Sequence, residues 1–247
     1  MSPDDRGCFI AFEGIEGSGK TTQCIELTDR LKRMNYVEVV KTHEPFYEGD
    51  IGKFIRKILY KEVKASDESL ALLFAADRLE HTKRMILPAL ERGAIVISDR
   101  YIHSSIAYQS GGMDTELDID WLWEINKHAL DPDLVIFLDV PAEEGLSRLR
   151  EGQKRVQDDS FFETLEKQSK IREQYHRIYN FEDSPEDWQL TECKGVSILI
   201  IDGTLSIKRI KRIILERVKK LLQEKKLEKK PEGEVNSLKL KTFLNEI

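Results

Sequence analysis

Five short apolar runs recur along the chain, and longer stretches with a helical pattern of apolar residues separate them. The runs are rich in β-branched and aromatic residues and are nearly continuously apolar, which is typical of strands buried on both faces of a parallel sheet. Their alternation with helices predicts a doubly wound α/β fold, a five-stranded parallel sheet flanked by helices. The predicted strands are Cys8–Glu13, Val37–Thr42, Ala94–Asp99, Leu134–Asp139 and Ser197–Asp202.

Polar residues gather at the carboxyl ends of these predicted strands. Ligands of open α/β sheets bind at that edge, in the crevice between the loops that leave the strands. We therefore expect a binding site there. The polar residues are Glu13, Thr42, His43, Glu44, Ser98, Asp99, Arg100, Asp139 and Asp202.

The last part of the chain has a different pattern. From Arg209 to Lys230, Lys and Glu are dense and apolar residues recur between them at helical spacing. This predicts an amphipathic helix whose apolar face packs on the sheet. We predict one domain over residues 7–222 and a charged extension over residues 223–247, in which a solvated helix face is favoured over a partner-binding tail. The apolar stripe is Ile210, Ile213, Ile214, Val218, Leu221 and Leu222.

Composition excludes several classes of protein. The chain has 247 residues, of which 40% are hydrophobic, and its net charge of −6 argues against a nucleic-acid-binding protein. Cys8, Cys24 and Cys193 are few and widely spaced, which indicates reduced thiols rather than a disulfide framework. No apolar run approaches the roughly 20 residues that span a bilayer, and the polar N-terminus lacks a signal-peptide core. We therefore expect a cytoplasmic protein with no membrane partner.

A phosphate-binding loop follows the first predicted strand directly. The motif G-x-x-x-x-G-K-T lies between a strand and a helix, which is the context that this motif requires. Its glycines allow backbone N–H groups to surround phosphate oxygens, and the helix N-terminus favours the same anion. We expect Lys20 to contact the β- and γ-phosphates and Thr21 to ligate Mg²⁺. The predicted ATP-binding residues are Gly14, Ile15, Glu16, Gly17, Ser18, Gly19, Lys20, Thr21 and Thr22.

The other motifs indicate a kinase with a second phosphate-bearing substrate. A GTPase needs an N/T-K-x-D motif after a strand, and the nearest match, at residues 126–129, lacks the Asp. Phe74 and Arg78 lie one helical turn apart, so that a ring and a guanidinium can meet one base. We expect Asp99 to hold a water of Mg²⁺ and Arg100 to bind the acceptor phosphate. The charged segment 148–161 is a candidate lid over ATP.

Together these segments resemble the thymidylate kinase family, a branch of the P-loop nucleoside monophosphate kinases. The resemblance runs from about Phe9 to about Leu222 and preserves the order and spacing of the motifs. The segment from Arg155 to Phe161 resembles the lid of the bacterial type. The other matching segments are Phe12–Thr22, Leu73–Arg78, Asp99–Gln109 and Pro132–Val140.

The resemblance implies a set of roles, a magnesium cofactor, the substrates ATP and dTMP, and a homodimer. Phe74 would stack on thymine, Arg78 would bind the base edge, and Arg100 would hold the dTMP phosphate. Glu16 would lie near the 3′-hydroxyl, and Tyr108 near the 2′ carbon, where it disfavours ribonucleotides. The phosphate loop has no arginine, so the family pattern assigns the catalytic arginine to the lid, with Arg155 as the candidate and Lys154 and Arg150 as alternatives. Lys20 and Arg100 complete the catalytic set, and Ser104, Ser105 and Gln109 would line the substrate pocket.

One loop departs from the family pattern. Where members commonly have Arg-Glu-Pro-Gly-Gly-Thr, this chain has His43 and Glu44 followed by Pro45, Phe46 and Tyr47. The residues after the loop fit again, so we expect Arg56 to reach the acceptor phosphate. Two added aromatic rings leave open a kinase for another nucleoside monophosphate. A non-catalytic nucleotide-binding switch is the more distant alternative, and the charged residues of the site argue against it.

Overall fold

A six-stranded sheet forms the centre of the protein in a computed structural model, which describes residues 6–36, 38–152 and 164–227. The strands lie in the order β2-β3-β1-β4-β6-β5. The first five in that order are mutually parallel, and β5 pairs with β6 in the antiparallel sense. The strands are β1 (Cys8–Glu13), β2 (Val39–His43), β3 (Ile95–Asp99), β4 (Leu134–Asp139), β5 (Trp188–Cys193) and β6 (Val196–Asp202).

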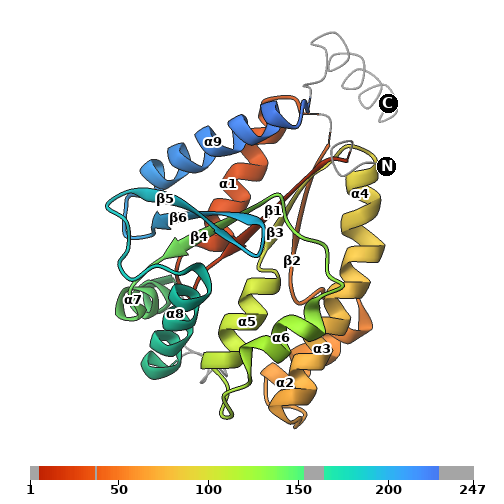
Figure 1. The fold of residues 1–247 in the computed structure, drawn as a ribbon, viewed down its shortest axis with the longest axis vertical. Coiled ribbons are helices and arrows are strands. Elements are labelled where there is room, and N and C mark those ends of the chain that lie inside the picture. Colours follow the sequence, from red (N-terminus) through yellow and green to blue (C-terminus); the bar gives the residue numbers. More distant parts are fainter. Residues whose placement is uncertain (1–5, 37, 153–163, 228–247) are drawn as a thin grey trace, which may run out of the picture.

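Helices cover both faces of this sheet (Figure 1). Helices α1 and α9 pack on one face, while α4, α5, α6 and α8 cover the other. Within the described segments, no helix is long and apolar enough to cross a membrane. The helices are α1 (Lys20–Arg33), α2 (Asp50–Leu59), α3 (Asp67–His81), the π-helix η2 (Thr82–Ile86), α4 (Leu87–Glu91), α5 (Ile102–Gly111), α6 (Ile119–Asn126), α7 (Ala142–Gly152), α8 (Leu165–Tyr179) and α9 (Ile207–Glu224).

The two-residue period of the strands divides the core into two halves. On β1, Phe9 and Ala11 belong to the cluster under α5 and α8, whereas Ile10 and Phe12 belong to the cluster under α1 and α9. Both clusters are fully buried at β1 and β4. This explains the nearly continuous apolar runs, because a strand covered on both faces has no solvent side.

The predicted doubly wound α/β fold is confirmed, but the sheet has six strands where five were predicted. All five predicted strands form and are parallel, but β5 adds an antiparallel edge strand. Its residues alternate between exposed and half-buried, and Trp188 and Leu190 are both close to half exposed. An edge strand of this kind lacks the continuous apolar run that identified the others. The turn to β6 uses Lys194 and Gly195, both with positive φ, and lacks the Asn-Gly pair typical of such hairpins.

The predicted C-terminal helix forms as α9, but it ends at Glu224, where the prediction extended it to Lys230. All six residues of its apolar stripe are buried against the sheet, and Leu227 beyond the helix packs on the same cluster. Residues 228–247 of the predicted extension lie outside the described residues. The division at residue 222 therefore remains a prediction.

Helices α3, η2 and α4 follow one another without a break in helical geometry. His81 and Leu87, which flank η2, and Thr82, its first residue, all have right-handed helical dihedrals. A π-turn inside an α-helix is rare and is frequent at functional sites. Here the π-turn begins directly after His81, a fully buried residue at the carboxyl edge of the sheet.

A buried carboxylate ties α8 to the sheet. Asp139 ends β4 and accepts hydrogen bonds from Arg172 at 2.8 and 2.9 Å, from His176, and from Ser184. Burial alone would raise the pKa of Asp139, but these hydrogen bonds outweigh burial and lower it to about 2. Asp139 therefore stays ionised and fixes the helix that lies under the phosphate loop.

Candidate active site

The phosphate loop has the geometry that the motif predicts. It leaves β1 and turns into α1 through glycines with positive φ. Gly17 also allows a close approach, because a Cβ atom there would lie 1.9 Å from the carbonyl oxygen of Gly145 on α7. A side chain at Gly17 or at Gly145 would push α7 away from the phosphate loop.

Lys20 points into this loop and is nearly buried. Its ammonium donates hydrogen bonds to the Ile15 carbonyl oxygen at 2.6 Å and to the Ser18 hydroxyl at 3.3 Å. Burial, together with the nearby Arg100 cation, lowers the pKa of Lys20 to about 8. A phosphate anion in the loop would oppose both effects and raise the pKa again.

Thr21 and Asp99 meet at the start of α1. β1 pairs with β3, so that Asp99 lies beside Phe12, and the Thr21 hydroxyl donates to the Asp99 carboxylate at 2.5 Å. A hydroxyl and a carboxylate oxygen are the hard ligands that Mg²⁺ prefers. The described segments hold no cluster of three or more His, Cys, Asp or Glu suited to a metal. These two residues therefore fit an ion that takes its remaining ligands from nucleotide phosphates and water.

The loop opens into a cavity of about 860 Å³. The cavity runs from the phosphate loop to Arg148 on α7 and to the loop between β6 and α9. Arg148 is held there by Glu144 and by the Gly203 carbonyl oxygen, each at 2.9 Å. This shape suits a nucleotide whose phosphates lie on Lys20.

A smaller cavity of about 170 Å³ adjoins the first, and Glu16, Tyr47 and Arg100 line both. Every residue predicted to bind the substrate lines this second cavity, with the exception of Arg56. Arg56 is exposed, and its guanidinium lies 5.1 Å from the ring centre of Tyr47 and 5.3 Å from that of Tyr60. The predicted residues in the lining are Glu16, Phe74, Arg78, Arg100, Ser104, Ser105, Tyr108 and Gln109.

Arg100 and Glu16 form the wall between the two cavities. The Arg100 guanidinium contacts Glu16 at 2.5 Å and Tyr108 at 3.0 Å, and it also donates to Ser104. Burial alone would raise the pKa of Glu16, but the Arg100 and Lys20 cations outweigh it and lower that pKa. The wall is thus a partly buried ion pair with polar neighbours on both sides.

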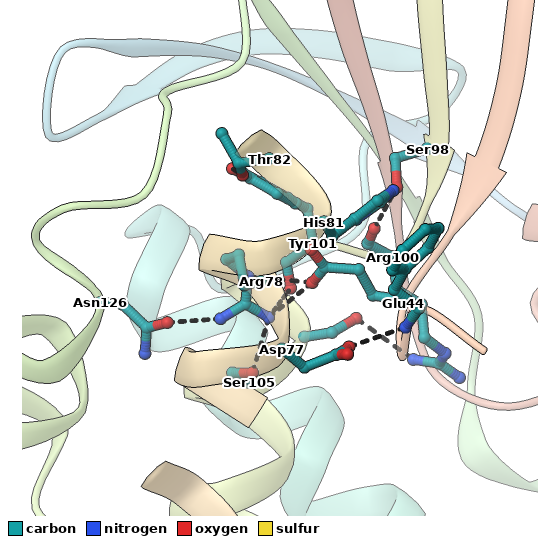
Figure 2. Close-up of polar contacts among 12 residues, drawn as sticks. Glu44, Asp77, Arg78, His81, Thr82, Ser98, Arg100, Tyr101, Ser105 and Asn126 are labelled. Atoms are coloured by element: carbon teal, nitrogen blue, oxygen red, sulfur yellow. Dashed lines mark hydrogen bonds and ion pairs between the residues drawn. The ribbon is translucent and has the colours of Figure 1, made fainter. Parts of the chain in front are cut away.

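Arg78 lies deeper and is only 1% exposed (Figure 2). Its guanidinium contacts Glu44 at 2.7 and 2.9 Å and Ser105 at 2.9 Å, and it donates to Asn126. Its side chain also lines the smaller cavity. The arginine predicted to bind a base edge is therefore held in place by buried partners.

The side chain of Gln109 has no polar partner in the described part of the chain. It is 1% exposed, and neither its amide oxygen nor its amide nitrogen has a hydrogen-bond partner among the described residues. A buried amide without partners costs free energy, so such a group indicates a place for a ligand or an ordered water.

Several residues of the site have no specific role in the sequence prediction. Glu44 and Asn126 contact Arg78, His81 contacts Glu44, and Tyr47 and Glu44 line both cavities. The sequence places Glu44 only among the polar residues at the strand ends, and Tyr47 only in the loop that departs from the family pattern. The sequence carries no comparable signal for His81 or Asn126.

The predicted catalytic residue Arg155 and its alternative Lys154 lie outside the described residues. The same holds for most of the predicted lid at 148–161. Within the described part, α7 carries the beginning of that segment, including Arg148 and Arg150. The assignment of Arg155 therefore stays a prediction.

The fold, the phosphate loop and the two adjoining cavities define a P-loop nucleotide-binding protein. A family model described as thymidylate kinase matches residues 12–188. A probable thymidylate kinase of Pyrococcus horikoshii is 45% identical over 178 residues, which is 70% of this chain and 83% of the relative. A thymidylate kinase of Leuconostoc citreum is 42% identical over 184 residues, 72% and 85% of the two chains.

A third relative, a probable thymidylate kinase of Methanococcus aeolicus, is 39% identical over 217 residues, 88% of this chain and 97% of its own. The chain belongs to the thymidylate kinase family. It is an ATP-dependent nucleoside monophosphate phosphotransferase.

Asp77 gives the site a testable pH dependence. One of its oxygens accepts from the Phe46 N–H at 2.7 Å, and the other has no partner in the described segments. Burial raises the pKa of Asp77 to about 6. The folded protein therefore holds this proton more tightly than the unfolded chain, and stability falls by roughly 3 kcal/mol as pH rises from about 4 to about 6.

We predict that the substitution Asp77→Asn, which keeps an acceptor for Phe46 but cannot ionise, removes this loss. The melting temperature of the variant should rise relative to the parent protein between pH 4 and pH 7.5. Thermal unfolding at both pH values measures the difference. A difference that is the same at both values would contradict the assignment.

Proposed function

We propose a division of roles between the two cavities for the reaction of a thymidylate kinase, in which the γ-phosphoryl group of ATP passes to dTMP to give ADP and dTDP. The observation that carries it is the wall formed by Arg100 and Glu16. Both residues line the cavity at the phosphate loop and the adjoining polar cavity, so substrates bound in the two cavities would lie next to each other at Arg100.

The larger cavity is the donor site in this proposal. The backbone from Gly14 to Thr22 surrounds the phosphates of ATP, and Lys20 neutralises their charge. Thr21 and Asp99 hold Mg²⁺, which when bound offsets negative charge on the phosphates. Arg148 and the loop between β6 and α9 hold the nucleoside end, and Arg155 supplies the catalytic charge from the lid.

The smaller cavity is the acceptor site. Arg100 binds the phosphate of dTMP, because a guanidinium pairs with two phosphate oxygens at once. Tyr108, whose ring lies 4.6 Å from the Arg100 guanidinium, packs near the 2′ carbon of the sugar and disfavours a 2′-hydroxyl. Arg56, whose guanidinium lies 5.1 Å from the ring centre of Tyr47, would bind the phosphate from the outer side of this cavity.

The inner end of this cavity reads the base. Thymine presents an acceptor at O4 next to a donor at N3, so it needs a donor and an acceptor from the protein. Arg78 supplies a donor, and the unpartnered amide of Gln109 can supply both kinds of group. Phe74 stacks on the ring, with Ser104 and Ser105 completing the pocket.

Catalysis in this arrangement depends on position and charge rather than on a general base. The acceptor phosphate is already ionised at neutral pH, so its oxygen can attack without losing a proton. The cations Lys20, Arg100 and Arg155 would hold two anions in line and stabilise the charge that develops during transfer.

The assembly and compartment are also part of the proposal. Phe54 on α2 and Leu72 on α3 are 42% and 51% exposed, although both are large and apolar, which favours a homodimer through these helices. The three cysteines are buried free thiols, which fits a reducing, cytoplasmic setting.

The proposal predicts that dTMP is the preferred acceptor. Release of ADP would be measured with ATP, Mg²⁺ and each of dTMP, dUMP, dCMP, dGMP, dAMP and UMP. We expect the highest kcat/KM for dTMP, with UMP rejected through Tyr108. Preference for another monophosphate would make the loop at Phe46 and Tyr47 a specificity determinant, and absence of any acceptor would contradict the proposal.

The substitution Arg78→Met should weaken the discrimination between dTMP and dCMP. Cytosine carries an amino group where thymine carries O4, so a fixed N–H donor favours thymine by roughly tenfold or more. The ratio of kcat/KM for the two substrates should fall, while the KM for ATP stays the same. Arg84→Met on η2, an exposed arginine paired with Glu80, is the matched control. An unchanged ratio in Arg78→Met would remove Arg78 from base recognition.

A further inference from the structure

Arg78 stands at the end of a buried chain of hydrogen bonds that begins at Thr42 on β2. Figure 2 labels the other three members, His81, Glu44 and Arg78. The Thr42 hydroxyl lies 2.7 Å from Nε2 of His81, and Nδ1 of His81 lies 3.2 Å from Glu44 Oε1. The other oxygen of Glu44 accepts from Arg78 Nε at 2.9 Å and Nη2 at 2.7 Å. All four residues are buried, so solvent does not compete for these contacts.

The direction of the hydrogen bond between His81 and Glu44 follows from the chemistry of the groups. Glu44 paired with Arg78 is an acceptor, so Nδ1 of His81 donates to it. The Thr42 hydroxyl, which can donate or accept, pairs with Nε2 on the other side of the ring. Both ring nitrogens of His81 therefore have partners, which fixes the orientation of the ring.

The same contacts leave one N–H of Arg78 uncommitted. A guanidinium has five N–H donors. Nε donates to Glu44, and the two N–H groups of Nη2 share Glu44, Ser105 and the Tyr101 carbonyl oxygen. Nη1 has two N–H groups and, among the described residues, one acceptor, Asn126. A single donor is therefore available to a base in the adjoining cavity.

The loop that departs from the family pattern packs against His81, a member of this chain of hydrogen bonds. The ring of Phe46 stacks on His81 with the centroids 4.7 Å apart and the planes at 16°. Its backbone N–H is fixed by Asp77, and the residue is 6% exposed. Phe46 is not part of the cavity lining, so its bulk supports His81 rather than reshaping the pocket.

We propose that His81 and Glu44 are positioning residues that set base specificity by fixing which N–H of Arg78 faces the substrate. This inference rests on the role of Arg78 given under the proposed function. A guanidinium held on three sides cannot rotate to avoid the amino group of cytosine. A loosened guanidinium can rotate, and it would then accept dCMP more readily.

Two substitutions at His81 separate positioning from a general structural role. His81→Leu removes both hydrogen bonds, while His81→Asn keeps a donor near the position of Nδ1 for Glu44. The kcat/KM values for dTMP, dUMP and dCMP would be measured for each. dUMP is the internal control, because its hydrogen-bonding edge is the same as that of dTMP.

We expect the dTMP to dCMP ratio to fall on the order of tenfold in His81→Leu and to stay within about twofold of the parent in His81→Asn. The dTMP to dUMP ratio and the KM for ATP should not change in either variant. Equal losses for all three substrates in His81→Leu would overturn the proposal, because that is the result of a structural defect alone.

Glu44→Gln keeps the shape of the chain but removes its charge, and it serves as the second test if His81→Leu does not fold. The dTMP to dCMP ratio should fall in this variant too, and an unchanged ratio would overturn the proposal. Arg78→Met separates base recognition by Arg78 from the positioning of Arg78. If its ratio is unchanged, base recognition by Arg78 fails; if its ratio falls but the ratios of His81→Leu and Glu44→Gln do not, only the positioning role fails.

Discussion

The site depends on compensation of buried positive charge before any substrate arrives. Arg100 is paired with Glu16, Arg78 with Glu44, and Lys20 donates to a carbonyl oxygen of its own loop. Charges buried without partners would cost several kcal/mol each. The carboxylates of Glu16 and Glu44 therefore stabilise several cationic side chains that lie close together in the site. When substrates bind, their phosphate oxygens can replace part of the negative charge that these carboxylates supply.

The fold places these groups at one edge because its five parallel strands all end there. β1 ends at the phosphate loop, β3 ends at Asp99 and Arg100, and β2 leads into Glu44. The register of strand pairing then fixes how far along the sheet each strand ends, as the pairing of Phe12 with Asp99 shows. A doubly wound sheet thus brings together residues that are widely separated along the chain.

The sequence predicts the parts of the structure that rest on local pattern. Continuous apolar runs identify the five parallel strands, and the phosphate loop is evident from its glycines and its context. The edge strand β5 escapes prediction because half of its residues face solvent and its turn uses an uncommon pair, Lys194 and Gly195. Positions of the strands also differ by a residue or two at β2, β3 and β6.

The surroundings of Arg78 could not be predicted for a different reason. Glu44 and Asn126, which pair with Arg78, come from the loop after β2 and from α6, and only the folded chain brings them to α3. His81, one turn along α3 from Arg78, pairs with Glu44. The aromatic residues of the departing loop suggested a reshaped pocket, yet Phe46 stacks on His81 outside the cavity, and Tyr47 alone contributes to its lining. The sequence of this loop therefore showed where the protein departs from the family pattern, but it did not show how that departure affects the pocket.

Proton uptake on ATP binding tests the account of compensated charge most directly. With a pKa of about 8, Lys20 is about half protonated at pH 8, and phosphates in the loop should complete its protonation. Calorimetric titration with ATP and Mg²⁺ at pH 8, in two buffers of different ionisation enthalpy, measures this directly. The account predicts uptake approaching about half a proton per ATP bound. No uptake, or release of protons, would contradict it.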